Sequence, residues 1–345
     1  MSLSAMRVCA LVVFTLLSAA CDKKTGQSGE PVQSKRVVTL YTERKEHLIK
    51  PLLDAFTAKT GVEVRYITDA AAPLIARLES EKEATPADIL MTVDVGNLWQ
   101  AQKRGLFRAI DSPNLQAAIP ANMRAADNTW FGLSSRARTI IYSTERVKPA
   151  QLSTYEALAD EQWRGRLCLR TAKKVYNQSL VATMINTIGE AKTEAIIKGW
   201  VANLATDPYS DDNMTMQAIL AGQCDVALVN TYYFGRLQLD NPKVALALFW
   251  PNQQDRGVHV NISGAGVTRF AKNPQDAQAL IEFLATPEAQ YIFAEANQEY
   301  PVNPAVKAAP NVLAWGEFKA DQVNVEAAGV LQEAAIKLMD RAGYR

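Results

Sequence analysis

The sequence predicts an α/β fold with two lobes. Short β-branched segments alternate with amphipathic helical segments from residue 36 onward, and two later extended segments suggest crossings between lobes. About 310 residues follow the N-terminal 35, which is enough for two lobes. Strands separated by helices imply a parallel sheet with helices on both faces, and ligands then bind beyond the carboxyl ends of the strands.

The first α/β unit begins with strands expected at 36–41, 62–67 and 87–92 and helices expected at 48–59 and 74–82. Leu48, Leu52, Leu53 and Phe56 have the spacing of one helix face, and Gly61 ends that helix. The loops after residues 41 and 92 follow strands of the predicted sheet. They are therefore candidate ligand loops.

The second unit lies between the two predicted crossings. Residues 138–142 lead out of the first unit, and residues 258–267 return to it. Between them we expect strands near 167–169 and 226–229 and helices at 179–188 and 214–221. The predicted division assigns 36–137 and 265–310 to the first lobe, and 138–264 and 311–345 to the second.

The first 20 residues have the layout of a secretory signal peptide. Arg7 is their only charge, an uncharged apolar run follows, and small residues end it at Ala20. The run is shorter than the roughly 20 residues of a spanning helix. A buried core helix or a single membrane anchor is the alternative.

Cys21 follows the small residues directly and resembles the acylated cysteine of a bacterial lipobox. Ser18 stands where that pattern prefers leucine, and cleavage after Ala20 without lipidation is the alternative. Lipidation of Cys21 is the preferred interpretation. Residues 21–35 would then form a polar, flexible tether to the membrane.

Two cysteines, Cys168 and Cys224, remain after the signal peptide and the lipidated cysteine. In an oxidising compartment two such cysteines are expected to pair as a disulfide. Two buried free thiols are the alternative.

Composition excludes several classes of protein. The 37 Lys and Arg nearly balance the 36 Asp and Glu, so no overall field favours nucleic acid or an anionic membrane surface. The two histidines, His47 and His259, and the cysteines do not form a zinc motif. No nucleophile with a paired base, phosphate loop or dinucleotide glycine signature is present, so the chain is not expected to be an enzyme.

Several motifs resemble periplasmic extracellular solute-binding proteins, and two resemble the ferric-iron-binding branch of that family. The general resemblance covers about residues 36–304 and includes LYTER at 40–44, RAR at 136–138 and NISGAG at 261–266. The specific motifs are VYNQSL at 175–180 and ALVNTYYFGRL at 227–237.

The resemblance implies a two-lobed periplasmic binding protein with a hinge of two crossing strands and a ferric site in the cleft. It implies that Tyr176, Tyr232 and Tyr233 ligate Fe³⁺ as phenolates, with a carbonate-like anion held by an arginine. By position Arg138 is the first candidate, and Arg136 and Arg44 follow. It also implies delivery to an inner-membrane ABC permease and its ATPase, and we expect a monomer.

The chemistry of tyrosine agrees with this interpretation. Ferric ion is a hard, highly charged cation that selects oxygen donors, and a bound cation lowers the pKa of a phenol steeply. Three phenolates would neutralise the charge of Fe³⁺. Adjacent Tyr232 and Tyr233 would point to opposite faces of a strand, so both reach one ion only from an irregular turn or a helix start, and Gly235 suits such a turn. Partly buried structural tyrosines are the alternative.

Other polar residues near the predicted cleft are weaker candidates. Arg136 and Arg138 would share one face of an extended segment and could bind an anion, or they could form ordinary ion pairs. Tyr41 ends the first strand and is a possible further cleft residue. Some family members carry a His-Tyr pair where this chain has Lys45 and Glu46. Two alternatives follow: the first lobe gives no direct ligand and an anion or water completes the coordination, or Glu46 takes that place.

Two other functions remain open. A protein of the same fold could bind a small organic or anionic solute such as a phosphonate, polyamine or sugar, with Tyr232 and Tyr233 as wall residues. A cell-surface hydrolase could use an acidic pair such as Glu43 and Glu46. Solvated positions at a helix start are the simpler interpretation of Glu43, Glu46 and His47.

Overall fold

The structure is a computed structural model that describes residues 35–345. The predictions for the signal peptide and for Cys21 concern residues outside this range. The strands are β1 (Val37–Thr42), β2 (Glu63–Thr68), β3 (Ile89–Thr92), β4 (Phe131–Ser143), β5 (Leu167–Cys168), β6 (Val226–Asn230), β7 (Leu246–Phe249) and β8 (Val260–Val267).

The helices alternate with the strands through most of the chain. They are α1 (Glu46–Thr60), α2 (Ala71–Glu81), α3 (Val95–Lys103), α4 (Pro113–Ala118), α5 (Val175–Ile188), α6 (Glu190–Ala202), α7 (Asp212–Leu220), α8 (Thr231–Asp240), α9 (Pro274–Leu284), α10 (Pro287–Asn297), α11 (Pro310–Leu313), α12 (Glu326–Val330) and α13 (Gln332–Arg341). Short 3-10 turns occupy Lys82–Ala84, Ala121–Met123, Pro149–Gln151, Glu156–Ala159 and Glu161–Trp163.

The elements predicted from periodicity are present within a few residues of their expected bounds. The buried face of α1 is Leu48, Ile49, Leu52, Leu53 and Phe56, which includes the four predicted positions. Gly61 ends α1 with a φ of 70°, in the left-handed region where glycine pays no steric penalty.

The sheet is mixed, and the prediction of a parallel sheet was wrong for its central strands. Among the described residues the strand order is β2-β1-β3-β8-β4-β6-β5, with β7 paired to β4. The first unit is parallel, since β1 pairs in parallel with β2 and β3. The long strand β4 is antiparallel to β6, β7 and β8, because the chain crosses between lobes in β4 and returns in β8.

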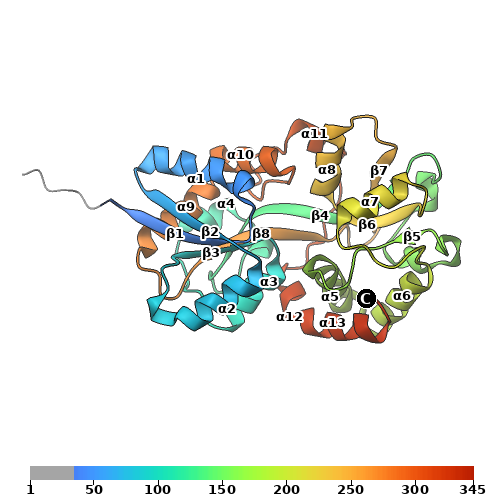
Figure 1. Ribbon diagram of the computed structural model, residues 1–345, viewed down its shortest axis with the longest axis horizontal. Coiled ribbons are helices and arrows are strands. Elements are labelled where there is room, and N and C mark those ends of the chain that lie inside the picture. The colour runs from blue at the N-terminus through green and yellow to red at the C-terminus, as the bar shows by residue number, and fades with distance from the viewer. Residues whose placement is uncertain (1–34) are drawn as a thin grey trace, which may run out of the picture. The chain divides into compact units, whose positions relative to one another are not determined.

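Strands β4 and β8 connect two groups of elements (Figure 1). Strands β1–β3 and helices α1, α2, α9 and α10 gather at one end, and β5–β7 with α5–α8 gather at the other. We call these groups the first lobe and the second lobe. The observed connection agrees with the predicted hinge of two crossing strands.

The C-terminal segment contacts both lobes. Tyr300 pairs with Ser135 of β4, and the Val325 amide donates to the Asn122 carbonyl at 3.0 Å. Helix α12 packs against α3 and α5, and α13 packs against α5 and α6. Residues 311–345, which were predicted to belong to the second lobe, therefore contact both lobes.

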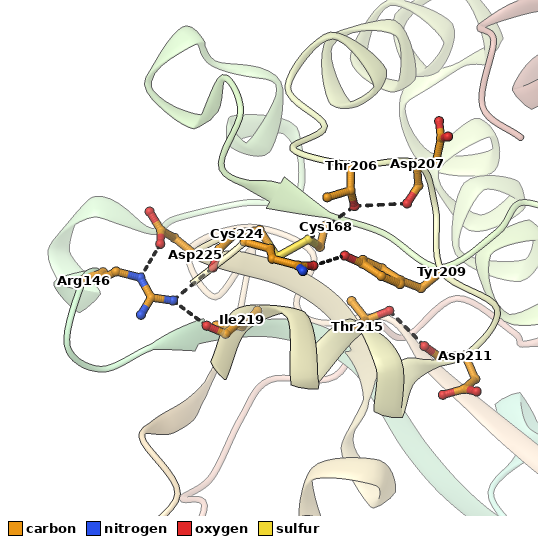
Figure 2. Close-up of a disulfide and its surroundings, with 11 residues drawn as sticks. Arg146, Cys168, Thr206, Asp207, Tyr209, Asp211, Thr215, Ile219, Cys224 and Asp225 are labelled. Carbon is orange, nitrogen blue, oxygen red and sulfur yellow. Dashed lines mark hydrogen bonds and ion pairs between the residues drawn. A yellow bond between two sulfur atoms is a disulfide. The ribbon is translucent and has the colours of Figure 1, made fainter. Parts of the chain in front are cut away.

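Cys168 and Cys224 form a disulfide, which confirms the predicted pairing. Figure 2 shows that it joins β5 to the segment preceding β6. Next to it, Arg146 pairs with Asp225 at 2.6 Å and donates to the Ile219 and Cys224 carbonyls. Cys168 is the last residue of β5, and Cys224 lies two residues before β6.

Among residues 35–345, no helix combines the length and apolar character needed to cross a bilayer.

Candidate functional site

A cavity of about 580 Å³ lies between the two lobes. On the first lobe its walls follow the carboxyl ends of β1, β2 and β3, at residues 43–46, 68–70 and 93. The predicted ligand loops after residues 41 and 92 therefore both line it. The second lobe contributes Arg170, Lys174, Tyr176, Asn213, Tyr232, Tyr233 and Arg236, and Leu48 and Glu299 complete the lining.

The three tyrosines singled out in the sequence meet on the second-lobe wall. Tyr176 lies in the first turn of α5, and Tyr232 and Tyr233 lie in the first turn of α8. The rings of Tyr232 and Tyr233 have centroids 4.4 Å apart. A helix start therefore directs both neighbouring side chains into one cavity, which a regular strand would not do.

Gly235 has a different role from the predicted one. It lies inside α8, and a Cβ there would come within 3.0 Å of the Gln298 and Trp315 side chains. Glycine at this position allows α8 to pack closely against the segment that follows α10, whereas the turn itself is the helix start.

The surroundings of Tyr176 and Tyr232 raise the pKa of both phenols, which favours their neutral form. Burial raises the pKa of Tyr176, and the nearby phenol of Tyr233 raises it further, while the Arg136 charge acts in the opposite direction. Burial also raises the pKa of Tyr232. A multivalent cation would reverse this balance, because opposite charge at bonding distance favours the phenolate. The positive ends of the α5 and α8 dipoles favour the same anionic form.

Arg138 is not available to an anion. Its Nε donates to Asn177 Oδ1 at 2.7 Å, and its Nη1 donates to Asp212 and Asn230 at 3.1 Å each. Its Nη2 donates to the Leu228 carbonyl and to Asp212. All its donors are engaged, and it does not line the cavity. Arg138, the first candidate for anion binding, therefore has no donor left for an anion.

Arg136 is buried beside Tyr176 and, like Arg138, does not itself line the cavity. Its Nη2 donates to the Val93 carbonyl and to Asp94, but its buried Nε and Nη1 have no hydrogen-bond partner in the part of the chain that is described. Its guanidinium lies 5.5 Å from the centroid of the Tyr176 ring. Arg136 therefore has two buried nitrogens without a partner in the described chain, next to the candidate ligand Tyr176.

Arg44 lines the cavity but is largely committed to structure. Its Nη2 lies 2.6 Å from Glu299 Oε2 and also donates to Ser134 and Ser263, while Nη1 donates to Asn297. Both partners of the Arg44–Glu299 ion pair are buried. Arg44 therefore joins β1 to the C-terminal end of α10, and of its nitrogens only Nε is without a partner in the described chain.

Sequence reasoning missed three basic residues of the second-lobe wall: Arg170, Lys174 and Arg236. Arg170 donates to the Tyr233 hydroxyl at 3.5 Å, and its Nε is buried without a partner in the described chain. Lys174 lies over the Tyr176 ring, and Arg236 lies over the Tyr232 ring. Arg170 could have been found, because it closely follows β5 at the carboxyl end of a strand.

Tyr41 does not line the cavity. It is completely buried, and its hydroxyl donates to the Glu81 carboxylate at 3.0 Å. Its position in β1 directs the ring toward α2, where it belongs to the core.

Glu46 and Glu43 both line the cavity but in different settings. Glu46 is exposed at the start of α1 and accepts from the Tyr66 hydroxyl at 2.7 Å. Glu43 is partly buried, contrary to the expectation of a solvated position, and burial raises the pKa of its carboxyl group.

Neither histidine approaches the cavity lining. His47 is exposed on α1, and His259 is buried beside Arg136 and Arg138. Within residues 35–345 no group of three or more His, Cys, Asp and Glu residues is arranged to hold a metal ion. The oxygen donors of the cavity are therefore phenols together with single carboxylates.

A mixed α/β chain with two lobes and a polar cleft between them is the architecture of a solute-binding protein. The family of bacterial extracellular solute-binding proteins matches residues 52–320, and the chain belongs to that family. Its relatives are binding and uptake proteins, in agreement with the expectation that the chain is not an enzyme.

Individual relatives cover nearly the whole chain. Iron uptake protein A1 of Synechocystis sp. is 39% identical, over 96% of this chain and 93% of its own length. The structure of Trichodesmium IdiA (FutA) in complex with iron and citrate ligands is 43% identical with a TM-score of 0.87, covering 90% of this chain and 100% of that one. Mannheimia haemolytica ferric iron-binding protein A in an open conformation is 37% identical with a TM-score of 0.84, covering 90% and 99%. These similarities confirm the resemblance and the two-lobed fold.

Proposed function

We propose that this protein binds ferric iron in the cleft between its lobes through the phenolate oxygens of Tyr176, Tyr232 and Tyr233. The observation that carries the proposal is the convergence of three phenols, from the first turns of α5 and α8, on one wall of the cavity. Hard oxygen donors suit Fe³⁺, and three phenolates match its charge. The names and bound iron of the relatives support the same cargo.

A small anion such as carbonate completes the coordination in this proposal. Arg170 and Arg136 are the residues that would hold it, because each has a buried Nε without a partner in the described chain and lies beside a proposed ligand. Arginine presents a planar set of donors that suits a carboxylate-like anion. Arg44 is a third, weaker candidate, because its ion pair with Glu299 takes up most of its donors.

Iron binds first to the second lobe, and the first lobe then closes over it. The hinge is formed by β4 and β8, and its motion belongs to the class known from periplasmic binding proteins. The closed form delivers iron to an inner-membrane ABC permease and its ATPase, and the protein acts as a monomer. It is exported by the signal peptide of residues 1–20 to the periplasm, where lipidated Cys21 and the tether of residues 21–35 hold it at the membrane.

The test is a visible spectrum of the chain lacking residues 1–21 after loading with ferric citrate and removal of excess. We expect a broad orange-red phenolate-to-iron band that a Tyr232→Phe, Tyr233→Phe double variant loses. Tyr300→Phe is the matched control, because the buried Tyr300 hydroxyl has no partner in the described chain and lies outside the cavity lining. A colourless wild-type protein without bound iron would refute the proposal and direct the search to organic anions in the same cleft.

A further inference from the structure

Glu43 is a carboxylate of the first lobe that is held in a defined position at the cleft. It follows β1 directly, and its backbone amide donates to the Met91 carbonyl at 3.0 Å. Its Oε2 accepts from the Val93 amide at 3.1 Å and from Asn97 Nδ2 at 3.2 Å. Neighbouring strands and the first turn of α3 therefore fix the side chain before any ligand arrives.

The second oxygen of this carboxylate remains available. Glu43 Oε1 accepts none of the hydrogen bonds found within residues 35–345, and the residue lines the cavity. The group is close enough to the second-lobe wall that its charge raises the pKa of the Tyr176 phenol, and the positive charge of Lys174 stabilises the Glu43 carboxylate. A fixed carboxylate with one free oxygen on the first lobe thus lines the same cavity as a proposed ligand on the second lobe.

Glu46 is less suited to the same role. Its Oε1 accepts from the Tyr66 hydroxyl at 2.7 Å, and the side chain is exposed at the start of α1. A ligand at this position would have to exchange that hydrogen bond for the metal bond and leave its solvated setting. Glu43 requires no such exchange, since both of its hydrogen bonds use the other oxygen.

We propose that Glu43 Oε1 is the first lobe's direct ligand to ferric iron, which makes the site a mixed tyrosinate–carboxylate one. This inference rests on the proposed function. Fe³⁺ with three phenolates and one carboxylate has a formal charge of −1, and the proposed small anion adds further negative charge. The nearby Lys174, Arg170 and Arg136 offset this charge. Because Glu43 lies on the first lobe and the tyrosines on the second, coordination by both would couple iron binding to closure.

The experiment compares Glu43→Gln with Glu46→Gln and with Glu145→Gln, an exposed carboxylate outside the cavity. Ferric affinity is measured by competition with citrate, and the visible spectrum is recorded for each loaded protein. For Glu43→Gln we expect the phenolate band to persist and to shift to longer wavelength, because loss of an anionic ligand makes the iron a stronger electron acceptor. We expect its affinity to fall at least tenfold, while Glu145→Gln matches the wild type.

A second comparison separates metal ligation from an ion pair across the cleft. If Glu43 acted only through Lys174, Lys174→Gln would abolish the effect of Glu43→Gln in the double variant. If Glu43 is a direct ligand, the Glu43→Gln substitution still lowers the ferric affinity and shifts the band in the Lys174→Gln background. Glu43→Ala replaces the glutamine variant if that one does not fold.

The outcomes that overturn this inference differ from those that overturn ferric binding itself. A coloured wild type together with an unshifted band in Glu43→Gln refutes the Glu43 ligand while leaving the tyrosine site intact. Loss of affinity and a band shift in Glu46→Gln alone would assign the ligand to Glu46 instead. A colourless wild type refutes both proposals.

Discussion

Arg138 Nη1 lies 3.1 Å from Asp212 Oδ2, and both side chains are almost fully buried in the second lobe. Asp212 also accepts from the Asn230 amide at 3.0 Å, so the pair joins β4, the start of α7 and the end of β6. Asn230 directly precedes α8, which carries two of the proposed ligands. The arginine that sequence position favoured for anion binding thus supports the wall of the site from behind.

Replacing Arg138 is therefore expected to affect stability first. Arg138→Met should lower the free energy of unfolding by about 3 kcal/mol, the lower end of the range for a broken buried ion pair, because Asp212 then keeps only its longer ion pair with Arg170 at 3.5 Å. Urea unfolding of the iron-free protein measures this. Arg236→Met, a half-buried arginine without an ion pair among the described residues, should cost less than about 1 kcal/mol. A similar small cost for both variants would contradict the structural role.

Arg170 is expected to affect iron binding in addition to stability, because it pairs with the buried Asp212 at 3.5 Å and also contacts the Tyr233 hydroxyl. Arg170→Gln removes a charge-assisted hydrogen bond to the Tyr233 hydroxyl, and such bonds contribute about 1.5–3 kcal/mol, so ferric affinity should fall by about tenfold or more. Competition with citrate provides the measurement. Arg166→Gln is the control, because Arg166 pairs with Asp225 outside the cavity. Equal ferric affinities in the two variants would show that Arg170 does not contribute to iron binding.

His259 is expected to make the iron-free protein acid-sensitive. Burial lowers the pKa of His259 to about 3, and the neighbouring charges of Arg136, Arg138 and Arg256 act in the same direction. In the unfolded chain its pKa is about 6.5. The unfolded state therefore binds the proton first as pH falls, so the stability that neutral His259 contributes is full above about pH 6.5 and is lost progressively toward pH 3.

Between pH 6.5 and pH 5 the free energy of unfolding should fall by about 2 kcal/mol, because it falls by up to about 1.4 kcal/mol per pH unit between the two pKa values of His259. Urea unfolding at both pH values measures it for the wild type and for His259→Leu, which lacks the titrating group. The variant should show a pH dependence smaller by that amount. Identical pH dependence in both proteins would show that His259 is not the group responsible.

The disulfide is expected to contribute substantially to stability. It links residues 56 apart in sequence, and closing a loop of that length corresponds to about 4 kcal/mol in the chain-entropy description. Double replacement Cys168→Ala, Cys224→Ala should lower the free energy of unfolding by about this amount, measured in urea. Treatment of the wild type with a reductant should reproduce the effect, and a change below about 1 kcal/mol would contradict it.

Much of the fold could be predicted from local sequence. The β-branched runs and the spacing of Leu48, Leu52, Leu53 and Phe56 predicted β1 and α1, because periodicity follows from which side chains an element must bury. The tyrosine motifs and the pairing of the remaining cysteines were also visible in the chain. The direction of the central strands could not be predicted, because whether β4 and β8 pair in parallel depends on the path of the chain between them.

The sequence by itself determined the α/β elements, because residue type and spacing carry that information. The resemblance of its motifs to solute-binding proteins implied the two-lobed class and Tyr176, Tyr232 and Tyr233 as candidate ligands. Only the tertiary structure decided which polar side chains near the cleft have all their hydrogen-bonding groups engaged within the protein and which keep one available. Arg138 donates to Asp212, Asn177 and Asn230. In the described chain Arg170 Nε and Glu43 Oε1, by contrast, have no partner, and both residues line the cleft. The physical reason is that hydrogen-bond satisfaction depends on partners brought together from distant parts of the chain, which no local pattern specifies.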